Sequence, residues 1–122
     1  MNISHHDEVL AATSHLPHML AYALVDTLAR MDDKQEIFEY AAGGFRDFTR
    51  IASSDPQMWH DICLSNQAAL LDVLERFTDD LKQLTDAIRQ GNSEYLKSTF
   101  VRAKKARDAF CEYKDLNNLS PE

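Results

Sequence analysis

Apolar residues recur along most of this chain at steps of three and four, the spacing that predicts α-helices with one buried face. From Leu16 to Leu28 they occupy most sides of the predicted helix, as in a helix that other parts of the protein surround. Pro17 lies inside this helix and lacks an N–H, so we expect a kink near Thr13 and Ser14. We predict that this segment is the central helix of the domain.

The longest helical pattern follows a strong start signal, Asp55 and then Pro56, which suit the N-cap and the first helical position. The pattern predicts one helix that runs to Arg89 or Gln90. At roughly 1.5 Å per residue this helix would approach about 50 Å, which is long for a small monomer, so we expect it to reach beyond one subunit. Its largely apolar stripe repeats about every 3.6 residues and consists of Trp59, Cys63, Asn66, Leu70, Val73, Phe77, Leu81, Leu84 and Ile88.

Glycines mark two further helix boundaries. The pair at positions 43 and 44 opens a predicted helix over residues 45–53, and Gly91 with Asn92 ends the long helix. No alternation of apolar and polar residues is long enough to predict a strand. We therefore predict an all-α helical bundle with one very long helix, which dimerises through its long helices.

The C-terminal part of the chain predicts one more helix, over about residues 93–113. Residues 114–122 lose the helical periodicity and are predicted to be a tail or a linker, so the domain is assigned to residues 1–113. The stripe of the last helix that we expect to be buried consists of Leu96, Phe100, Ala103, Phe110 and Tyr113.

Charge and composition exclude several classes of function. The 13 Lys and Arg residues against 20 Asp and Glu give a net charge of −7, which argues against binding to nucleic acid or to an anionic membrane. No run approaches the roughly 20 apolar residues of a membrane span, and the first residues lack a secretory pattern. Cys63 and Cys111 form no disulfide framework, so we expect a reducing cytoplasm. With glycines only at positions 43, 44 and 91, no G-x-G-x-x-G turn can form, and no cofactor is expected to bind this chain.

A first candidate site lies around the proline of the central helix. Ser14 and His18 are four residues apart and share a helix face, where a hydroxyl and an imidazole suit a carboxylate or carbonyl ligand. His15 is expected to point elsewhere. Two alternatives stay open: His18 is a core histidine at a proline kink, or a metal is bound by His15 and His18 with help from His5, His6 or His60.

A second candidate site follows the glycine pair. Gly44 lets backbone amides approach a ligand closely, and Arg50 can form paired hydrogen bonds with a carboxylate. Asp47 lies three residues before Arg50 and can position its guanidinium. The alternative is an ordinary glycine corner with a surface ion pair. Trp59, the one tryptophan, is expected to be either a core anchor or a wall of the same pocket.

These motifs together give a family resemblance. HD at residues 6–7, SHLPH at 14–18, AGGFRDFTRIA at 42–52, SDP at 54–56 and MW at 58–59 closely resemble the C-terminal helical domain of prephenate dehydrogenases, a family that includes cyclohexadienyl and arogenate dehydrogenases. The resemblance covers about residues 5–113. It implies a homodimer in which a separate Rossmann domain binds NAD or NADP and the helical domain forms the dimer interface and part of the substrate pocket.

The resemblance also implies roles for single residues. The family reaction is the oxidative decarboxylation of prephenate, a small dianion, to 4-hydroxyphenylpyruvate in tyrosine biosynthesis. By motif position Arg50 resembles the arginine that binds a substrate carboxylate, Asp47 its partner, and His18 with Ser14 the other end of the pocket. The Rossmann domain and its catalytic histidine have no counterpart in this sequence, so we assign no catalytic residue and expect no dehydrogenase activity from the chain alone. The alternative function is a regulatory module that binds tyrosine or a related aromatic acid without catalysis.

Overall fold

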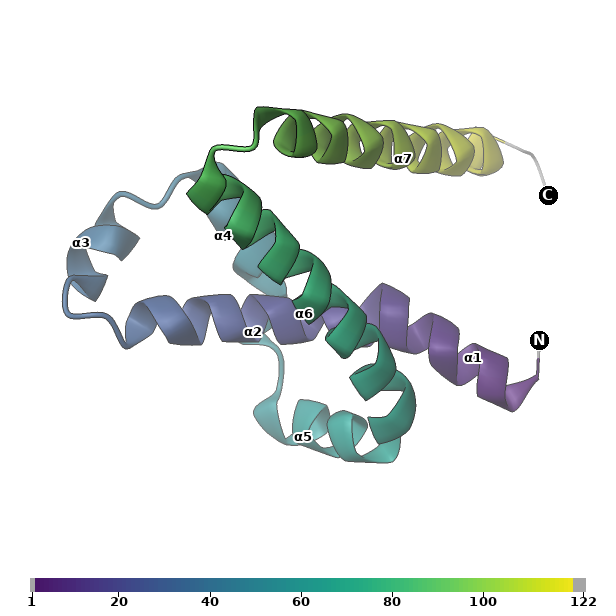
Figure 1. The fold of residues 1–122 in the computed structure, drawn as a ribbon. Coiled ribbons are helices and arrows are strands. Elements are labelled where there is room, and N and C mark those ends of the chain that lie inside the picture. The colour runs from purple at the N-terminus through teal and green to yellow at the C-terminus, as the bar shows by residue number, and fades with distance from the viewer. Residues whose placement is uncertain (1, 120–122) are drawn as a thin grey trace. The chain divides into compact units, whose positions relative to one another are not determined.

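The computed structural model describes residues 2–119, and their side chains as far as residue 117. Every regular element in that range is helical, so the all-α prediction is confirmed (Figure 1). The elements are α1 (Ile3–Leu10), the π-helical η1 (Ala11–His15), α2 (Leu16–Ala29), α3 (Lys34–Glu39), α4 (Gly43–Thr49), the 3-10 helix η2 (Arg50–Ser53), α5 (Pro56–Ser65), α6 (Gln67–Gln90) and α7 (Ser93–Leu119).

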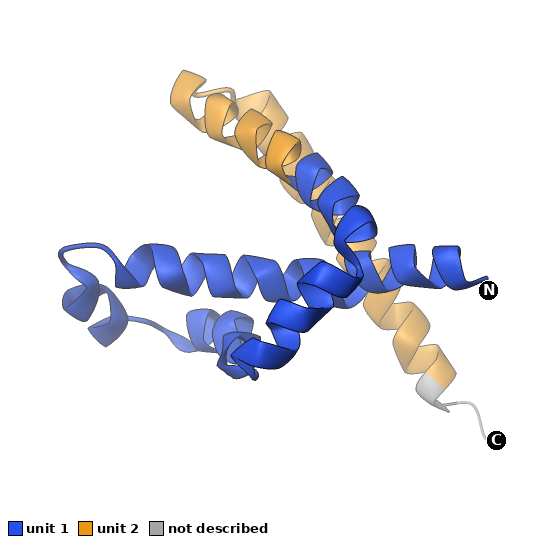
Figure 2. Cartoon of the chain, turned by 90° about the horizontal axis from the view of Figure 1, so that it is seen from below, with its two compact units in different colours: residues 1–77 blue, residues 78–122 orange. Residues whose placement is uncertain are grey.

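The chain divides into two compact units, unit 1 with residues 1–77 and unit 2 with residues 78–122 (Figure 2). The boundary falls within α6, so the first part of this helix belongs to unit 1 and the second part to unit 2.

In unit 1 the helix α2 packs against α3, α4 and η2, which agrees with its predicted central place. Side-chain contacts join segments far apart in the sequence; among them, the Tyr22 hydroxyl donates to the Ser54 carbonyl at 2.8 Å, and Cys63 Sγ lies 3.5 Å from Met19 Sδ. The buried apolar residues of this unit are Ala11, Ala21, Trp59 and Leu70. Small side chains on η1 and α2 let neighbouring backbones approach closely.

The prediction of a single helix from Pro56 to Gln90 is wrong, because the helix is interrupted at Asn66 and forms two helices. Helix α5 ends at Ser65 and α6 begins at Gln67, because Asn66 leaves the helical region with φ −119° and ψ 38°. An asparagine side chain competes with the helical backbone for hydrogen bonds, which makes such a break inexpensive. The stripe continues in register across the break, so periodicity alone could not reveal it.

The boundary between α6 and α7 follows the prediction. Gly91 has φ +64°, a left-handed conformation that favours glycine. Its N–H donates to the Ile88 carbonyl at 3.2 Å, and the Asn92 N–H donates to the Ala87 carbonyl at 2.8 Å. These two bonds form a Schellman motif, which ends the helix. The Asn92 side chain then accepts from the Tyr95 N–H at 3.1 Å and caps α7.

Helix α7 differs from its prediction in length and in burial. It continues past Tyr113 to Leu119, so most of the segment predicted as a tail is helical, and residues 120–122 lie outside the described range. The stripe predicted to be buried is largely exposed, with Phe100 at 58%, Phe110 at 54% and Tyr113 at 65% exposure. The predicted burial of this stripe is therefore wrong for a single chain. Unit 2 contains only α7 and the end of α6, which are too few elements to cover the stripe.

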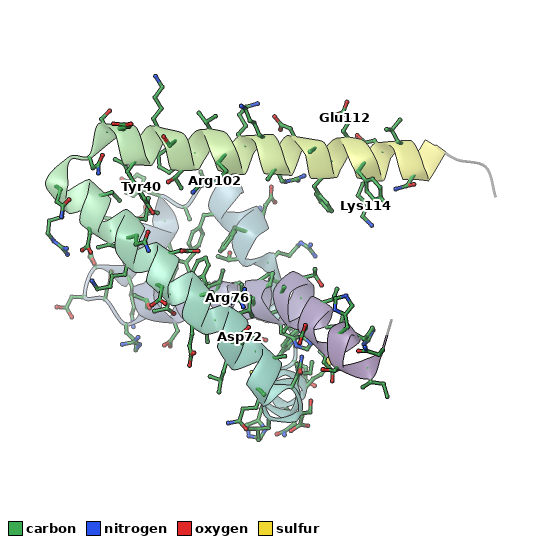
Figure 3. The ribbon with its side chains drawn as sticks, turned by 45° about the vertical axis from the view of Figure 1, so that its right-hand side comes forward. Tyr40, Asp72, Arg76, Arg102, Glu112 and Lys114 are labelled. Atoms are coloured by element: carbon green, nitrogen blue, oxygen red, sulfur yellow. The ribbon has the colours of Figure 1, made fainter. Side chains whose placement is uncertain are left out.

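Charged side chains are exposed along the long helices. On α6 the Arg76 guanidinium lies 3.5 Å from the Asp72 carboxylate one helical turn away, and on α7 Glu112 and Lys114 project from opposite sides of the helix (Figure 3). Exposed ion pairs of this kind contribute little stability. Within residues 2–119 no helix combines the length and the apolar character needed to cross a membrane.

Candidate functional site

A local widening of the first long helix precedes Pro17. In η1 the Leu16 N–H donates to the Ala11 carbonyl, five residues back, which is the π-helical pattern. The irregularity predicted at Thr13 and Ser14 therefore takes the form of a π-helical segment. Such segments displace the residues around the helix axis relative to the 3.6-residue repeat, which changes which side chains share a face.

His18 is held by the backbone of this segment. Its ring Nδ1 lies 2.8 Å from the Ser14 carbonyl oxygen. Because a carbonyl oxygen only accepts, Nδ1 carries the proton, and Nε2 of the neutral ring is an acceptor. The structure thus brings Ser14 and His18 together as predicted, although Ser14 takes part through its carbonyl.

Trp59 joins the same cluster from α5. The Asp55 carboxylate accepts from the Gln57 N–H at 3.1 Å and fixes the start of that helix. Trp59 is 6% exposed and stacks on His18, with ring centroids 3.8 Å apart and planes at 19°. Its buried indole N–H has no acceptor among the described residues. Leaving such a donor unpaired costs free energy, so the indole is a candidate contact for a ligand or a water molecule.

Trp59 is both a core anchor and a pocket wall. On one side it lines an apolar hollow of about 240 Å³ together with Met19, Tyr22, Pro56, His60 and Cys63. Gly44, Asp47 and Arg50 do not line this hollow, so it leaves open whether Trp59 is also a wall of the second candidate site.

His15 reaches the same indole, contrary to the expectation that it points elsewhere. Its ring meets Trp59 edge-on, with centroids 5.9 Å apart and planes at 80°. Its Nδ1 lies 3.2 Å from Asn66 Nδ2, the amide nitrogen at the break between α5 and α6. The pKa of His15 is lowered below its ordinary 6.5, first by burial and then by His18, while Asp7 acts in the opposite direction. We name His15, His18 and Trp59 the histidine–tryptophan cluster.

The glycine pair begins α4 without any packing constraint. Ala42 is extended at the N-cap, and the Arg46 N–H donates to its carbonyl at 3.1 Å. A Cβ added at Gly43 or at Gly44 would meet nothing within 4 Å. The space beside Gly44 is therefore open to a ligand, which is what the predicted role of this glycine requires.

The basic residues of the second candidate site separate. Arg46 lines a hollow of about 420 Å³ at the start of α4, together with Phe38, Phe45 and Thr49. Arg50 begins η2 and is exposed, as is Asp47. No ion pair joins Asp47 to Arg50 in the described part of the chain.

The predicted site residues thus form two groups in unit 1. Ser14, His18 and Trp59 make direct contacts, whereas Gly44, Asp47 and Arg50 lie on α4 and η2 without bonds to them. The packing of α2 against α4 and η2 places the two groups on neighbouring elements. Sequence reasoning missed the contacts of His15 with Trp59 and of Asn66 with His15. Pro17 could have warned that the register around His15 is irregular, and Asn66 stands out as the polar residue in an apolar stripe.

The described residues suit neither a metal ion nor a dinucleotide. Within residues 2–119 no group of three or more His, Cys, Asp or Glu side chains could hold a metal. The glycine pair forms the first two residues of α4, a helix of seven residues, and the remaining glycine ends α6. Neither arrangement is the glycine-rich turn between a strand and a helix that holds a pyrophosphate, so these residues do not fit such a cofactor.

Long helices with exposed apolar side chains are typical of a helical association domain. Comparison with known families makes this specific. The model of the family described as "Prephenate dehydrogenase, dimerization domain" matches residues 2–102. The chain belongs to this family, as the motifs of residues 6–59 predicted.

Individual relatives agree. The chain is 48% identical over 109 residues to the cyclohexadienyl dehydrogenase of Zymomonas mobilis subsp. mobilis, a match that covers 88% of this chain and 37% of that protein. It is also similar to a crystal structure of prephenate dehydrogenase from A. aeolicus in complex with hydroxyphenyl propionate and NAD+, with a TM-score of 0.73, 42% identity, and 87% of this chain and 39% of that chain covered. Synechocystis arogenate dehydrogenase gives a TM-score of 0.85 at 28% identity, over 90% of this chain and 41% of the other. The chain spans well under half the length of each.

Proposed function

We propose that this chain is the dimerising and substrate-binding part of an NAD(P)-dependent prephenate dehydrogenase, which converts prephenate to 4-hydroxyphenylpyruvate and CO2 in tyrosine biosynthesis. The observation that carries the proposal is the match of the dimerization-domain model to residues 2–102. The names of the relatives support the reaction class, and the A. aeolicus complex supports NAD as the cofactor of the whole enzyme.

In this proposal the chain binds and orients the substrate and performs no chemical step alone. Arg50 forms a paired hydrogen bond with a substrate carboxylate, and Asp47 restrains its guanidinium. His18, held by Ser14, and the indole of Trp59 line the other end of the pocket. Gly44 lets the ligand approach the backbone. The cofactor, and the base that removes the ring hydroxyl proton, belong to the nucleotide-binding part of the enzyme.

The partner proposed for the exposed apolar surface is a second copy of this chain. Phe100, Phe110 and Tyr113 on α7 are each more than half exposed. Aromatic side chains at such positions are typical of subunit interfaces. A homodimer covers them without any other protein. The free thiols of Cys63 and Cys111 suit the cytoplasm, which we propose as the location.

Calorimetric titration with prephenate and with hydroxyphenyl propionate tests the substrate site. We expect Arg50→Ala to weaken binding by about 2 to 4 kcal/mol, or roughly 30-fold to 1000-fold, because a charge-assisted pair is lost. Arg30→Ala is the matched control, since Arg30 pairs with Asp26 on the exposed side of α2.

Three results would contradict parts of the proposal. Equal affinity of the Arg50→Ala variant would remove Arg50 from the site, and a loss in Arg46→Ala instead would move the anion site to the hollow at the start of α4. Binding of tyrosine but not of prephenate would favour the regulatory module over the enzyme domain.

A further inference from the structure

The amide of Asn66 has an orientation that its surroundings determine. Its Nδ2 lies 2.9 Å from the Asp7 carbonyl oxygen, a contact between residues 59 positions apart. A carbonyl oxygen only accepts, so the atom that faces it must be the NH2 group and not the amide oxygen. One of the two amide hydrogens is therefore used by the backbone of α1.

The second amide hydrogen is available to the imidazole of His15. Nδ1 of that ring lies 3.2 Å from the same Asn66 nitrogen. Because an amide NH2 only donates, His15 Nδ1 must accept, and the proton of the neutral ring then lies on Nε2. Burial lowers the pKa of His15, which favours the neutral ring that this arrangement requires.

His18 has the opposite arrangement. Its Nδ1 donates to the Ser14 carbonyl, which leaves Nε2 as an acceptor. Both rings pack on Trp59, one stacked and one edge-on. The cluster therefore presents one ring nitrogen that donates and one that accepts.

We infer that Asn66 is a positioning residue of the histidine–tryptophan cluster, which ties the break between α5 and α6 to the π-helical segment and holds His15 in the Nε2–H form. The backbone break is part of this function, since φ −119° and ψ 38° place Asn66 outside both helices. A helical residue in the same stripe would have no such freedom. As a statement about a substrate pocket the inference rests on the proposed function, whereas the proton position is a property of the free chain.

The charged groups around this contact come from each packed element. Asp7 of α1 and His18 of α2 act directly on His15. Glu8 of α1 and Asp72 of α6 line a hollow of about 320 Å³ that Asn66 and Asp7 also line. Among these carboxylates Asp7 favours a charged His15 by raising its pKa, so the amide of Asn66, which favours the neutral ring, acts against it.

Long-range ¹H–¹⁵N correlation of the histidine rings in the ¹⁵N-labelled full chain tests the inference without a ligand. In the wild type we expect a protonated Nε2 and an unprotonated Nδ1 for His15, and the reverse for His18. His15→Gln assigns the signals. A protonated Nδ1 on neutral His15 in the wild type would overturn the inference, and no variant is needed for that result.

Two substitutions then test whether Asn66 positions the His15 ring. In Asn66→Ala we expect the His15 nitrogens to move toward averaged shifts and its pKa to rise, because the donor to the neutral ring is lost, while His18 keeps Nδ1–H. In Asn66→Asp, which has nearly the same shape, the carboxylate accepts from the ring, and we expect His15 to carry its proton on Nδ1 and its pKa to rise further. Gln67→Ala is the control and should change neither ring.

An unchanged His15 spectrum in both variants, with helical content retained by circular dichroism, would show that Asn66 does not position the ring. Failure of the chain to bind prephenate would count against the proposed function only, because the proton positions are read in the free chain.

Discussion

Unit 1 and unit 2 are both helical, yet different interactions order them. In unit 1, hydrogen bonds join distant segments, such as Tyr22 to Ser54 and Asn66 to Asp7, and four apolar residues of its described part are buried. In unit 2, the ion pairs link residues three or four positions apart, as in Lys82–Asp86 and Lys104–Asp108, and among its described residues only Ala87 is a buried apolar side chain. Local pairs stabilise a helix but do not fix its neighbours. In unit 2 the Tyr95 hydroxyl, which donates to Gln83 Oε1 at 3.3 Å, links α7 to α6.

This comparison shows that similar apolar stripes in the sequence can be either buried within one chain or left exposed. The stripes of α6 and α7 are as regular as the pattern of α2, but many of their apolar side chains remain exposed in one chain. Unit 1 forms the histidine–tryptophan cluster from its own residues, although it also exposes large apolar side chains such as Phe48 and Leu64. Unit 2 presents a surface that a second copy completes in the proposed dimer.

The largest expected effect concerns the centre of unit 1. Trp59→Ala should lower the free energy of unfolding by about 3 to 5 kcal/mol, because it leaves a cavity beside His15 and His18. Urea unfolding followed by circular dichroism measures this change. Met58→Ala is the control, since Met58 is 46% exposed, and an equal loss in both variants would contradict the central place of Trp59.

A smaller effect is expected in unit 2, on association. Phe110→Asp should weaken the proposed dimer by about 2 kcal/mol, roughly 30-fold in Kd, because a charge replaces an aromatic contact. Sedimentation equilibrium measures the dissociation constant. Ser98→Asp adds the same side chain on the other side of α7 and should leave it unchanged. If the wild type is strictly monomeric at tens of micromolar, the exposed apolar surface of unit 2 is not a dimer interface, and the proposed difference between the two units is wrong.

The hydrogen bond from Tyr22 to Ser54 should contribute less. Tyr22→Phe leaves the Ser54 carbonyl without this donor and should lower the free energy of unfolding by about 1 kcal/mol. Tyr40→Phe is the matched control, because Tyr40 is 77% exposed. If thermal unfolding does not separate the two variants, this link between α2 and the end of η2 adds nothing measurable to unit 1.

The smallest effect is a dependence on pH. Because the folded pKa of His15 lies below its ordinary 6.5, the unfolded chain takes up this proton first, and stability is lost as the pH falls through 6.5 toward the folded pKa. The lowered pKa values of Asp61, beside His60 and Gln57, and of Asp86, beside Lys82 and Arg89, act in a different window, below the ordinary 3.8.

Urea midpoints measured between pH 8 and pH 5 should therefore decline less in His15→Gln than in the wild type. The same substitution at the exposed His6 serves as the control. Parallel pH profiles for wild type and His15→Gln would show that the ring is not held neutral in the folded state.

Much of the fold is visible in local signals. Asp55 with Pro56 starts α5, Gly91 with Asn92 ends α6 and caps α7, and Pro17 announces the irregular segment before it. Such signals act within one helical turn, so the residues that carry them are neighbours in the sequence. The family motifs of residues 6–59 are local in the same sense, and the match to residues 2–102 confirms the family that they predicted.

Contacts between distant residues could not be predicted in this way. Asn66 occupies a regular position in a stripe, and its bond to Asp7, 59 positions away, cannot be read from that position. His15 joins Trp59 because the π-helical segment displaces it. Whether Arg50 or Arg46 serves an anion depends on where α4 and η2 place each side chain, which spacing along one helix does not determine.

The sequence by itself determined the helices, most of their ends and the family, because these depend on residues within a few positions of one another. The tertiary structure decided which faces are covered, where the long helix divides and which ring nitrogen of His15 carries a proton. Each of these depends on atoms that folding brings together from distant positions, as Asn66 meets Asp7 across 59 residues.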